Sequence, residues 1–194
     1  MLNTFTKKID TVKENRKLKN IELNRKSIDD FKNSEKMPVV VVLDNIRSLN
    51  NIGSVFRTSD AMLVQQIVLC GISGTPPHKE IYRTALGAEN SVAWEYHTST
   101  LEAISKLKSD DYIIISLEQT ESSENLADFQ PVVGKRYAFV FGNELRGVDQ
   151  DVVNQSDKCI EIPQFGTKHS FNIAVSVGIV LWDYYIKVRP MNNH

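Results

Sequence analysis

The most constraining feature of the sequence is the run PVVVVL at positions 38–43, in which every residue is apolar and four in succession are valine. Valine favours extended backbone, and a strand without polar alternation is buried on both of its faces. Such strands occur in parallel sheets that helices cover on both sides. Similar short apolar runs alternate along the chain with segments of helical periodicity. The sequence therefore predicts an α/β domain with a mostly parallel sheet flanked by helices.

The alternation predicts six strands and four helices. The expected strands are 38–43, 65–70, 91–97, 112–117, 136–142 and 158–163, and the expected helices are 51–62, 79–88, 98–110 and 172–188. Near Met37 the composition changes from polar to apolar. We therefore expect a helical or flexible, basic N-terminal extension, residues 1–36, followed by one domain, residues 37–194.

Composition and charge set the broad class. The 194 residues are 41% hydrophobic and 24% charged, which is ordinary for one globular domain. The extension carries ten basic and six acidic residues, so its charge is +4 and that of the remainder is −5. Such an arm suits contact with an RNA backbone and is equally typical of a solubilising tail. Without a signal-peptide core or an apolar run long enough to span a bilayer, the expected location is the cytoplasm.

Several common chemistries lack their sequence patterns. No G-x-G-x-x-G follows a strand, and GNELRG at 142–147 lacks the Lys-Ser/Thr of a phosphate-binding P-loop. The histidines and cysteines show no metal-ligand spacing, so no metal is expected, and Cys70 and Cys159 are expected to be small buried hydrophobes. His169 and Ser170 are adjacent in sequence, which does not set a nucleophile against its base.

The stretch NNIGSVFR, at positions 50–57, combines a sheet-packing face with an arginine that leaves it. Ile52 lies on the face expected to pack on the sheet, and Arg57 lies about 140° around the helix from it. Asn50 or Asn51 is expected to cap the helix. Arg57 is therefore either an exposed helix residue or a residue directed at a ligand.

The stretch FVFGNELRGVD, at positions 139–149, follows a buried strand with a polar loop bounded by Gly142 and Gly147. Ligands of α/β proteins gather at the carboxyl ends of strands, so Glu144 in this loop is a candidate site residue. The alternative is an ordinary connection in which Asp149 caps a following helix.

The stretch EIPQFGTKHSFN, at positions 161–172, links a strand to the last helix. Ser170 and Asn172 place polar groups where a core helix needs none. The helix itself is apolar on nearly all sides through Trp182, which predicts burial either within the domain or against a second subunit.

Taken together, the three stretches resemble the motifs of the SpoU (TrmH-like) RNA 2′-O-methyltransferases of the SPOUT class. The first family motif, an Asn and then an Arg in a helix, matches Asn51 and Arg57. The second, a strand ending in G-x-E-x-x-G, matches Gly142, Glu144 and Gly147. The third, I-P-x-x-G-x-x-x-S-L-N, is matched by Ile162, Pro163, Gly166, Ser170, Phe171 in place of Leu, and Asn172. The resemblance covers the predicted domain and not the extension.

This resemblance implies a fold, a cofactor and an assembly. The fold would be an α/β sheet whose C-terminal segment forms a trefoil knot. The cofactor would be S-adenosylmethionine, and the protein would work without a metal as a homodimer paired through its last helix. The implied cofactor-binding residues are Leu117, Gly142, Ile162, Ser170 and Phe171.

The implied reaction is methyl transfer to a ribose 2′-hydroxyl of tRNA or rRNA, with Arg57 as the catalytic residue and Asn51, Glu144 and Asn172 shaping the same site. A ribose hydroxyl is a poor nucleophile, so it must be oriented and must lose its proton. Because a free guanidinium is protonated far above neutral pH, Arg57 either acts as a base with assistance or orients the hydroxyl. It would do so from its own subunit or from the partner.

Two other functions fit parts of the sequence. A non-catalytic RNA-binding protein on the same fold is disfavoured because the set of motif residues is complete. A small-molecule enzyme using a dinucleotide is disfavoured because its glycine fingerprint is absent. The choice between transfer and ribosomal RNA stays open, with a slight preference for tRNA, and the modified nucleotide is not indicated.

Overall fold

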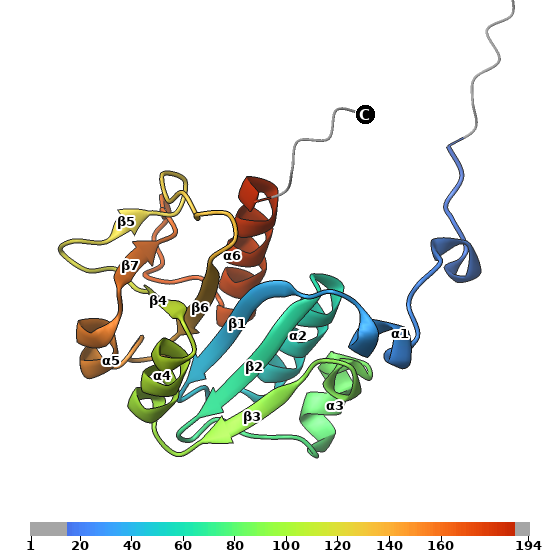
Figure 1. The fold of residues 1–194 in the computed structure, drawn as a ribbon, viewed down its shortest axis with the longest axis horizontal. Helices are drawn as coiled ribbons and strands as arrows, with labels where there is room; N and C mark the ends of the chain where they lie inside the picture. Colours follow the sequence, from blue (N-terminus) through green and yellow to red (C-terminus); the bar gives the residue numbers. More distant parts are fainter. Residues whose placement is uncertain (1–14, 189–194) are drawn as a thin grey trace, which may run out of the picture.

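A computed structural model describes residues 15–188, which form one seven-stranded sheet covered by helices (Figure 1). The strands are β1 (Met37–Asp44), β2 (Val64–Cys70), β3 (Trp94–His97), β4 (Tyr112–Leu117), β5 (Glu124–Asn125), β6 (Arg136–Phe141) and β7 (Lys158–Glu161). The helices are α1 (Ile28–Asn33), α2 (Leu49–Ala61), α3 (Lys79–Ala85), α4 (Thr100–Ser109), α5 (Gln150–Gln155) and α6 (Ile173–Val188), with short 3-10 turns η1 (Asn20–Leu23) and η2 (Ala88–Asn90).

All strand pairs in the sheet are parallel, and their order is β3-β2-β1-β6-β4-β7-β5. The chain moves outward from β1 to β3 and then crosses to the other half of the sheet, so the direction of progression reverses between β1 and β6. Ligand sites of open parallel sheets lie at the carboxyl ends of strands beside such a reversal. The predicted parallel α/β architecture is confirmed.

Strand β1 explains why a purely apolar run is needed at the centre of the sheet. Val39, Val41 and Leu43 are fully buried against the layer formed by α2, α3 and α6, whereas Val40 and Val42 are fully buried against α4 and α5. Because neighbouring side chains of a strand point to opposite faces, both faces of β1 must be apolar.

Several of the expected boundaries differ from the structure. The helix starting at Lys79 ends at Ala85, because Leu86 adopts a left-handed conformation (φ 54°) that stops it before Gly87. The strand expected at 91–97 is confined to β3, since residues 88–90 form a 3-10 turn. The short elements β5 and α5 were not predicted, although Asp149 does cap α5, with its side chain accepting a hydrogen bond from the Asp151 amide.

Helix α2 packs as expected but begins earlier. Ile52 and Phe56 are fully buried against the sheet. The cap is Ser48, whose hydroxyl accepts a hydrogen bond from the Asn51 amide at 3.2 Å, so neither Asn50 nor Asn51 is the cap. A serine hydroxyl satisfies the free amides of the first helical turn as well as an asparagine side chain does. The side chain of Asn51 is therefore available for other hydrogen bonds.

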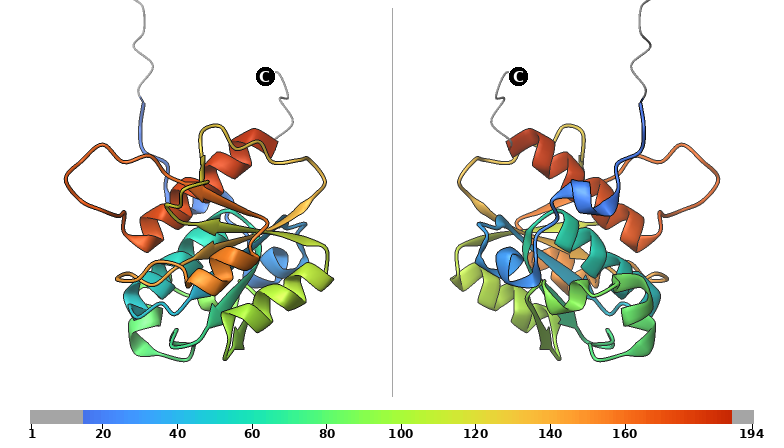
Figure 2. Two further views of the ribbon diagram at one scale, coloured as in Figure 1. Left: turned by 90° about the vertical axis from the view of Figure 1, so that its left-hand side faces the viewer. Right: turned by 90° about the vertical axis from the view of Figure 1, so that its right-hand side faces the viewer.

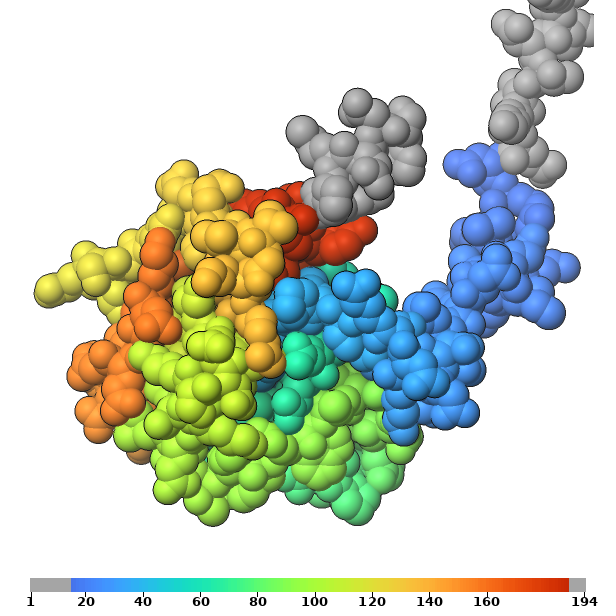
Figure 3. Space-filling view, viewed as in Figure 1, coloured from blue at the N-terminus to red at the C-terminus, as the bar shows by residue number. Residues whose placement is uncertain are grey.

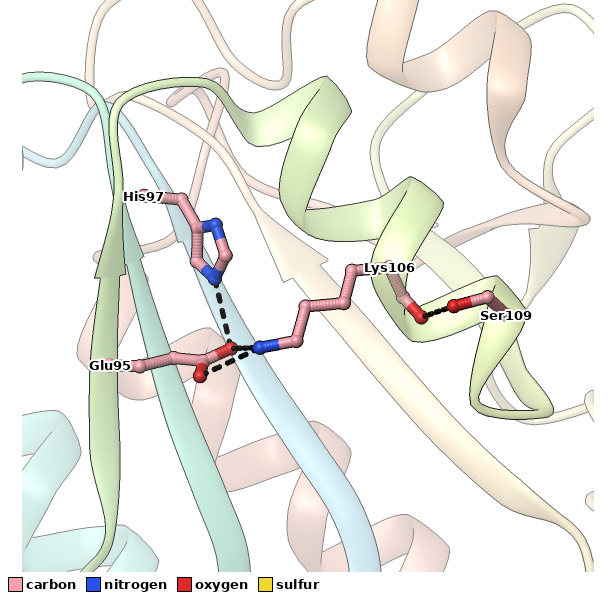
Figure 4. Close-up of polar contacts among 4 residues, drawn as sticks. All are labelled: Glu95, His97, Lys106 and Ser109. Carbon is pink, nitrogen blue, oxygen red and sulfur yellow. Dashed lines mark hydrogen bonds and ion pairs between the residues drawn. The ribbon is translucent and has the colours of Figure 1, made fainter.

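The edge strand β3 is tied to α4 by a charged cluster (Figure 4). The Glu95 carboxylate lies 2.9 Å from Nε2 of His97 and 3.1 Å from the ammonium group of Lys106. Burial opposes ionisation of Glu95, but these two partners outweigh it and lower the pKa of the carboxyl. The cluster lies at the sheet edge and contributes no lining residue to the cavities described below.

The N-terminal arm leaves the body of the protein at α1 (Figure 3). Phe31 of α1 is buried in the core, and the Lys36 ammonium lies 4.6 Å from the centre of its ring. Residues 15–27 are almost entirely exposed. Residues 1–14 of the predicted extension lie outside the described residues. Across residues 15–188 no helix is long and apolar enough to cross a membrane.

Gly53 is expected to be essential for the contact between α2 and α3. A Cβ atom at this position would lie 2.3 Å from the backbone oxygen of Ile81, so α3 would have to move away. We predict that Gly53→Ala lowers the free energy of unfolding by about 1–3 kcal/mol, measured by urea denaturation.

Gly166 supplies the control, because a Cβ there would meet nothing within 4 Å. Gly166→Ala should change the free energy of unfolding by no more than about 0.5 kcal/mol. Equal effects of the two substitutions would show that the close approach at Gly53 is not important for stability.

Candidate active site

A cavity of about 530 Å³ lies at the carboxyl ends of β4, β6 and β7. Its walls come from the loop after β4, the loop after β6, and the loop from β7 to α6. The lining residues are Leu117, Glu118, Gln119, Phe141, Gly142, Asn143, Glu144, Leu145, Arg146, Gly147, Ile160, Glu161, Ile162, Gln164, His169, Ser170, Phe171, Asn172, Ile173 and Ser176.

The five residues expected to hold the cofactor all line this cavity: Leu117, Gly142, Ile162, Ser170 and Phe171. They come from three loops that lie far apart in the sequence. The loop at 162–172 stands away from the body beside α6 and is almost entirely exposed from Phe165 onward (Figure 2). The cavity therefore combines a wall packed against the sheet with one that is open to solvent.

The loop after β6 is closed by a tight turn, and Gly142 begins it. The amide of Asn143 donates to the carbonyl of Gly147, and the amide of Gly147 donates to the carbonyl of Asn143, both at 2.9 Å. A Cβ at Gly142 would lie only 2.0 Å from the amide nitrogen of Val148. Only glycine permits this approach, so the turn exists in this form because residue 142 has no side chain.

Glu118 holds the far side of the same turn. Its carboxylate accepts a 2.9 Å hydrogen bond from the amide of Val148 and lies directly against Gly147, which has a φ of 71°. Sequence reasoning missed Glu118. The signal that could have found it is a charged residue placed directly after the buried strand β4, at the edge of the sheet where ligands bind.

The Glu144 carboxylate connects the turn to the start of α2. It accepts hydrogen bonds from the amide of Arg47 at 3.1 Å, the amide of Ser48 at 3.0 Å and the side-chain amide of Asn51 at 3.2 Å. Partial burial acts to raise the pKa of Glu144, but these donors outweigh it, so the pKa lies below its usual value. The Glu144 carboxylate therefore serves as a hydrogen-bond acceptor and is a weak base for proton transfer.

Asn51 extends this network to the last helix. Its side-chain oxygen accepts a 3.1 Å hydrogen bond from the side-chain amide of Asn172. The side-chain oxygen of Asn172 in turn accepts the amide of Ala174 at 2.9 Å and so caps α6. Thus Glu144, Asn51 and Asn172, which were expected to shape one site, form a continuous chain of hydrogen bonds.

Arg57 is placed differently from the other motif residues. It is exposed on α2, it is not among the residues that line the cavity, and its guanidinium has no hydrogen-bond or ion-pair partner within residues 15–188. One helical position along, Thr58 faces Gly178 of α6. In a single chain Arg57 thus lies on the exposed side of α2 and outside the cavity.

The residues that could bind metal or act as thiol nucleophiles are not arranged for it. Among the described residues there is no group of three or more His, Cys, Asp or Glu side chains able to hold a metal ion. Burial raises the pKa of the Cys70 thiol to about 12, and burial also raises that of Cys159, which is only partly buried. Both sulfurs are protonated at neutral pH.

Chemically, the cavity is lined by apolar side chains, among them Leu117, Phe141 and Ile162, together with polar and charged side chains. Such a mixed lining suits a planar heterocycle with a polar tail. The Glu144 carboxylate already accepts three hydrogen bonds and its pKa is lowered, so it is a weak base for a proton from a bound substrate.

Comparison with known proteins gives a family match and several similar RNA 2′-O-methyltransferases. Residues 38–182 match the model of the SpoU rRNA methylase family. The chain is 29% identical over 157 residues to the 23S rRNA (guanosine-2′-O-)-methyltransferase RlmB of Neisseria meningitidis, covering 79% of this chain and 60% of that protein. It is 27% identical to a tRNA (guanosine(18)-2′-O)-methyltransferase of Borreliella burgdorferi, covering 76% and 66%. The chain thus spans less than two thirds of either relative.

Solved structures agree on the architecture. A TrmH/SpoU tRNA modifying enzyme of A. aeolicus superimposes with a TM-score of 0.71 at 25% identity, covering 81% of this chain and 78% of that one. An AdoMet-bound rRNA methyltransferase of Sinorhizobium meliloti gives 0.73 at 22% identity, covering 80% and 59%, and shows the shared fold. On the match over residues 38–182, the chain belongs to the SpoU rRNA methylase family.

Proposed function

We propose that this protein is an S-adenosylmethionine-dependent RNA methyltransferase that modifies a ribose 2′-hydroxyl of tRNA or rRNA. The observation that carries the proposal is the convergence of three distant motif segments on one cavity, with Glu144, Asn51 and Asn172 joined by hydrogen bonds. The names of the relatives, which include ribosomal and transfer RNA 2′-O-methyltransferases, support it. Such a role belongs in the cytoplasm, where these RNAs are found.

The cavity fits the proposed cofactor. Leu117, Ile162 and Phe171 supply apolar walls for an adenine ring, and the glycine at position 142 leaves backbone groups accessible to it. When bound, S-adenosylmethionine supplies a methyl group already activated by a sulfonium. The chain's own task is to hold the ribose hydroxyl in line with that methyl group and to accommodate the hydroxyl proton.

We assign Arg57 to orienting the ribose hydroxyl. A protonated guanidinium can donate several hydrogen bonds but cannot accept a proton, so orientation through the hydroxyl oxygen or a neighbouring phosphate suits it. Glu144 is a poor alternative base, because its three hydrogen-bond donors stabilise the carboxylate and lower its pKa. Asn51 and Asn172 position the two helices α2 and α6 relative to the cavity.

We further propose that the protein is a homodimer paired through α6. Val177, Val180 and Leu181 pack on the core, but the opposite face of the helix exposes Val175, Trp182 and Ile186, with Trp182 57% exposed. An apolar face of this kind on a surface helix is typical of an interface. Because α2 lies beside α6, a second copy on this face would bring its Arg57 close to the interface and supports action across subunits.

The remaining family features are proposals as well. A knotted C-terminal segment is proposed on the match to the SpoU family over residues 38–182. The basic arm of residues 1–36 is proposed to contact RNA backbone, since residues 15–27 extend from the body and carry exposed cations (Figure 3). The alternative, a non-catalytic RNA-binding protein, would keep the cavity but perform no transfer.

The proposed activity is tested by calorimetry with S-adenosylmethionine together with mass mapping of ribose methylation in tRNA and rRNA from a deletion strain. We expect saturable binding to the purified protein and the loss of a 2′-O-methyl group that the protein restores in vitro. Absence of cofactor binding would exclude the activity. Binding without any missing methyl group would support the non-catalytic alternative.

Arg57→Ala is predicted to leave cofactor affinity within about twofold of the wild type and to lower methyl transfer at least about 100-fold, because orientation of the nucleophile is lost. Calorimetry and single-turnover transfer to the mapped RNA measure the two quantities. Lys135→Ala, which removes an exposed cation at the opposite end of β6, is the control and should behave as wild type. Near-full activity of Arg57→Ala would remove Arg57 from its proposed role.

Trp182→Glu is predicted to convert the protein from dimer to monomer, because a carboxylate cannot be buried unpaired in an apolar interface. Light scattering after size exclusion should give twice the chain mass for the wild type and one chain mass for the variant. Val133→Glu, at an exposed apolar residue outside α6, should remain dimeric. A monomeric wild type, or a dimeric Trp182→Glu, would contradict pairing through α6.

A further inference from the structure

A second cavity lies directly beside the candidate active site. Its volume is about 440 Å³, and it is formed where the loops after β1, β2 and β6 meet. The two cavities share the turn after β6 as a common wall: Asn143, Leu145, Arg146 and Gly147 line both. A molecule in the second cavity would therefore contact the same turn as the proposed cofactor.

Two arginines stand at this second cavity without an acidic partner. Arg47, from the loop after β1, and Arg146, from the shared turn, are both exposed and line the cavity. Within residues 15–188 neither guanidinium forms an ion pair or hydrogen bond. Unpaired guanidinium groups that flank a cavity can bind a phosphate from two sides.

The two carboxylates that line this cavity differ in exposure. Asp44 is 1% exposed, and its oxygens accept hydrogen bonds from the hydroxyl of Thr100, the side chain of Asn45 and the amide of Asp149. Asp149 is exposed, and one oxygen of its carboxylate caps α5 by accepting the amide of Asp151. The accessible charges of the cavity are thus the cations of Arg47 and Arg146 and the single carboxylate of Asp149.

The cavity also has an apolar wall made of side chains that the fold leaves uncovered. Ile72 is 65% exposed and Leu145 is 78% exposed, and both line the cavity. The loop that carries Ile72 is fixed, since the Ile72 amide donates to the side-chain oxygen of Asn45 at 3.1 Å. A firm apolar surface beside two cations matches a nucleotide, whose base is flat and apolar on its faces and whose phosphate is anionic.

We propose that this second cavity, the Arg47/Arg146 pocket, binds a nucleotide of the RNA substrate next to the one that is methylated. The phosphate lies between Arg47 and Arg146, and the base packs on Ile72 and Leu145. The inference rests on the proposed function, because it assumes that RNA is the substrate. It assigns to these residues a role in RNA binding separate from the binding of the cofactor.

The test compares wild type, Arg47→Gln, Arg146→Gln and the double variant in binding to total tRNA and, separately, total rRNA from a deletion strain at several KCl concentrations. Each single substitution should weaken binding of the substrate RNA roughly tenfold. Each should also reduce the slope of log affinity against log salt by about 0.7–0.9, the value of one lost phosphate contact. S-adenosylmethionine affinity should stay at the wild-type value in Arg47→Gln, because Arg47 lines the second cavity and not the first.

Lys135→Gln is the matched control, because it removes an exposed cation far from the pocket and should change neither the affinity nor the slope. Thermal unfolding checks that the arginine variants are folded, which is expected since both residues are exposed. RNA affinity and salt slope equal to wild type in the double variant would overturn the pocket while leaving the proposed function intact. Loss of S-adenosylmethionine binding in Arg47→Gln would also overturn it, by making the pocket part of the cofactor site.

A wild-type protein that binds no S-adenosylmethionine and methylates no RNA would instead refute the proposed function itself. The two failures are therefore distinguishable, since one is seen in the wild type and the other only in the comparison of variants. A reduction in RNA affinity that is equal for Lys135→Gln and the arginine variants would show a diffuse charge effect and would likewise overturn the pocket.

Discussion

The carboxylate of Glu144 is the interaction on which the candidate site depends. It ties the turn after β6 to the first residues before α2 through the amides of Arg47 and Ser48, and to α2 itself through Asn51. An ionised carboxylate that accepts several charge-assisted hydrogen bonds gives a stiff link between segments that are otherwise joined only through the sheet. Glutamine could not replace it fully, because one of its two terminal groups is a donor.

The link through Glu144 can form only because β1 and β6 are neighbours in the sheet. The reversal of the chain between β1 and β6 places the loops of these neighbouring strands side by side at the carboxyl edge of the sheet. The adjacent β4 and β7 bring the remaining two loops to the same edge. The parallel sheet therefore gathers residues from positions 47 to 172 into one region, and the hydrogen bonds of Glu144, Asn51 and Asn172 fix their relative positions.

Much of this arrangement was predictable from the sequence, for physical reasons that differ among elements. The long apolar strands and the helix face of Ile52 and Phe56 were predictable because burial imposes its period on the sequence. The two-residue β5 and the six-residue α5 were not, since elements so short carry no period and depend on neighbours for their hydrogen bonds. Polar residues of the site were found where they formed a motif, and Glu118 was missed because a single carboxylate after a strand has no distinctive pattern.

The turn from Asn143 to Gly147 separates two cavities with a wall only one turn of backbone thick. Glycine is required at Gly142 for its close approach to Val148, and Gly147 adopts a positive φ against Glu118, so the path of this wall cannot shift to favour one side alone. Within the turn, the exposed side chains are those of Leu145 and Arg146. Substitution at these two positions would change the lining of both cavities at once, with the backbone beneath them held constant.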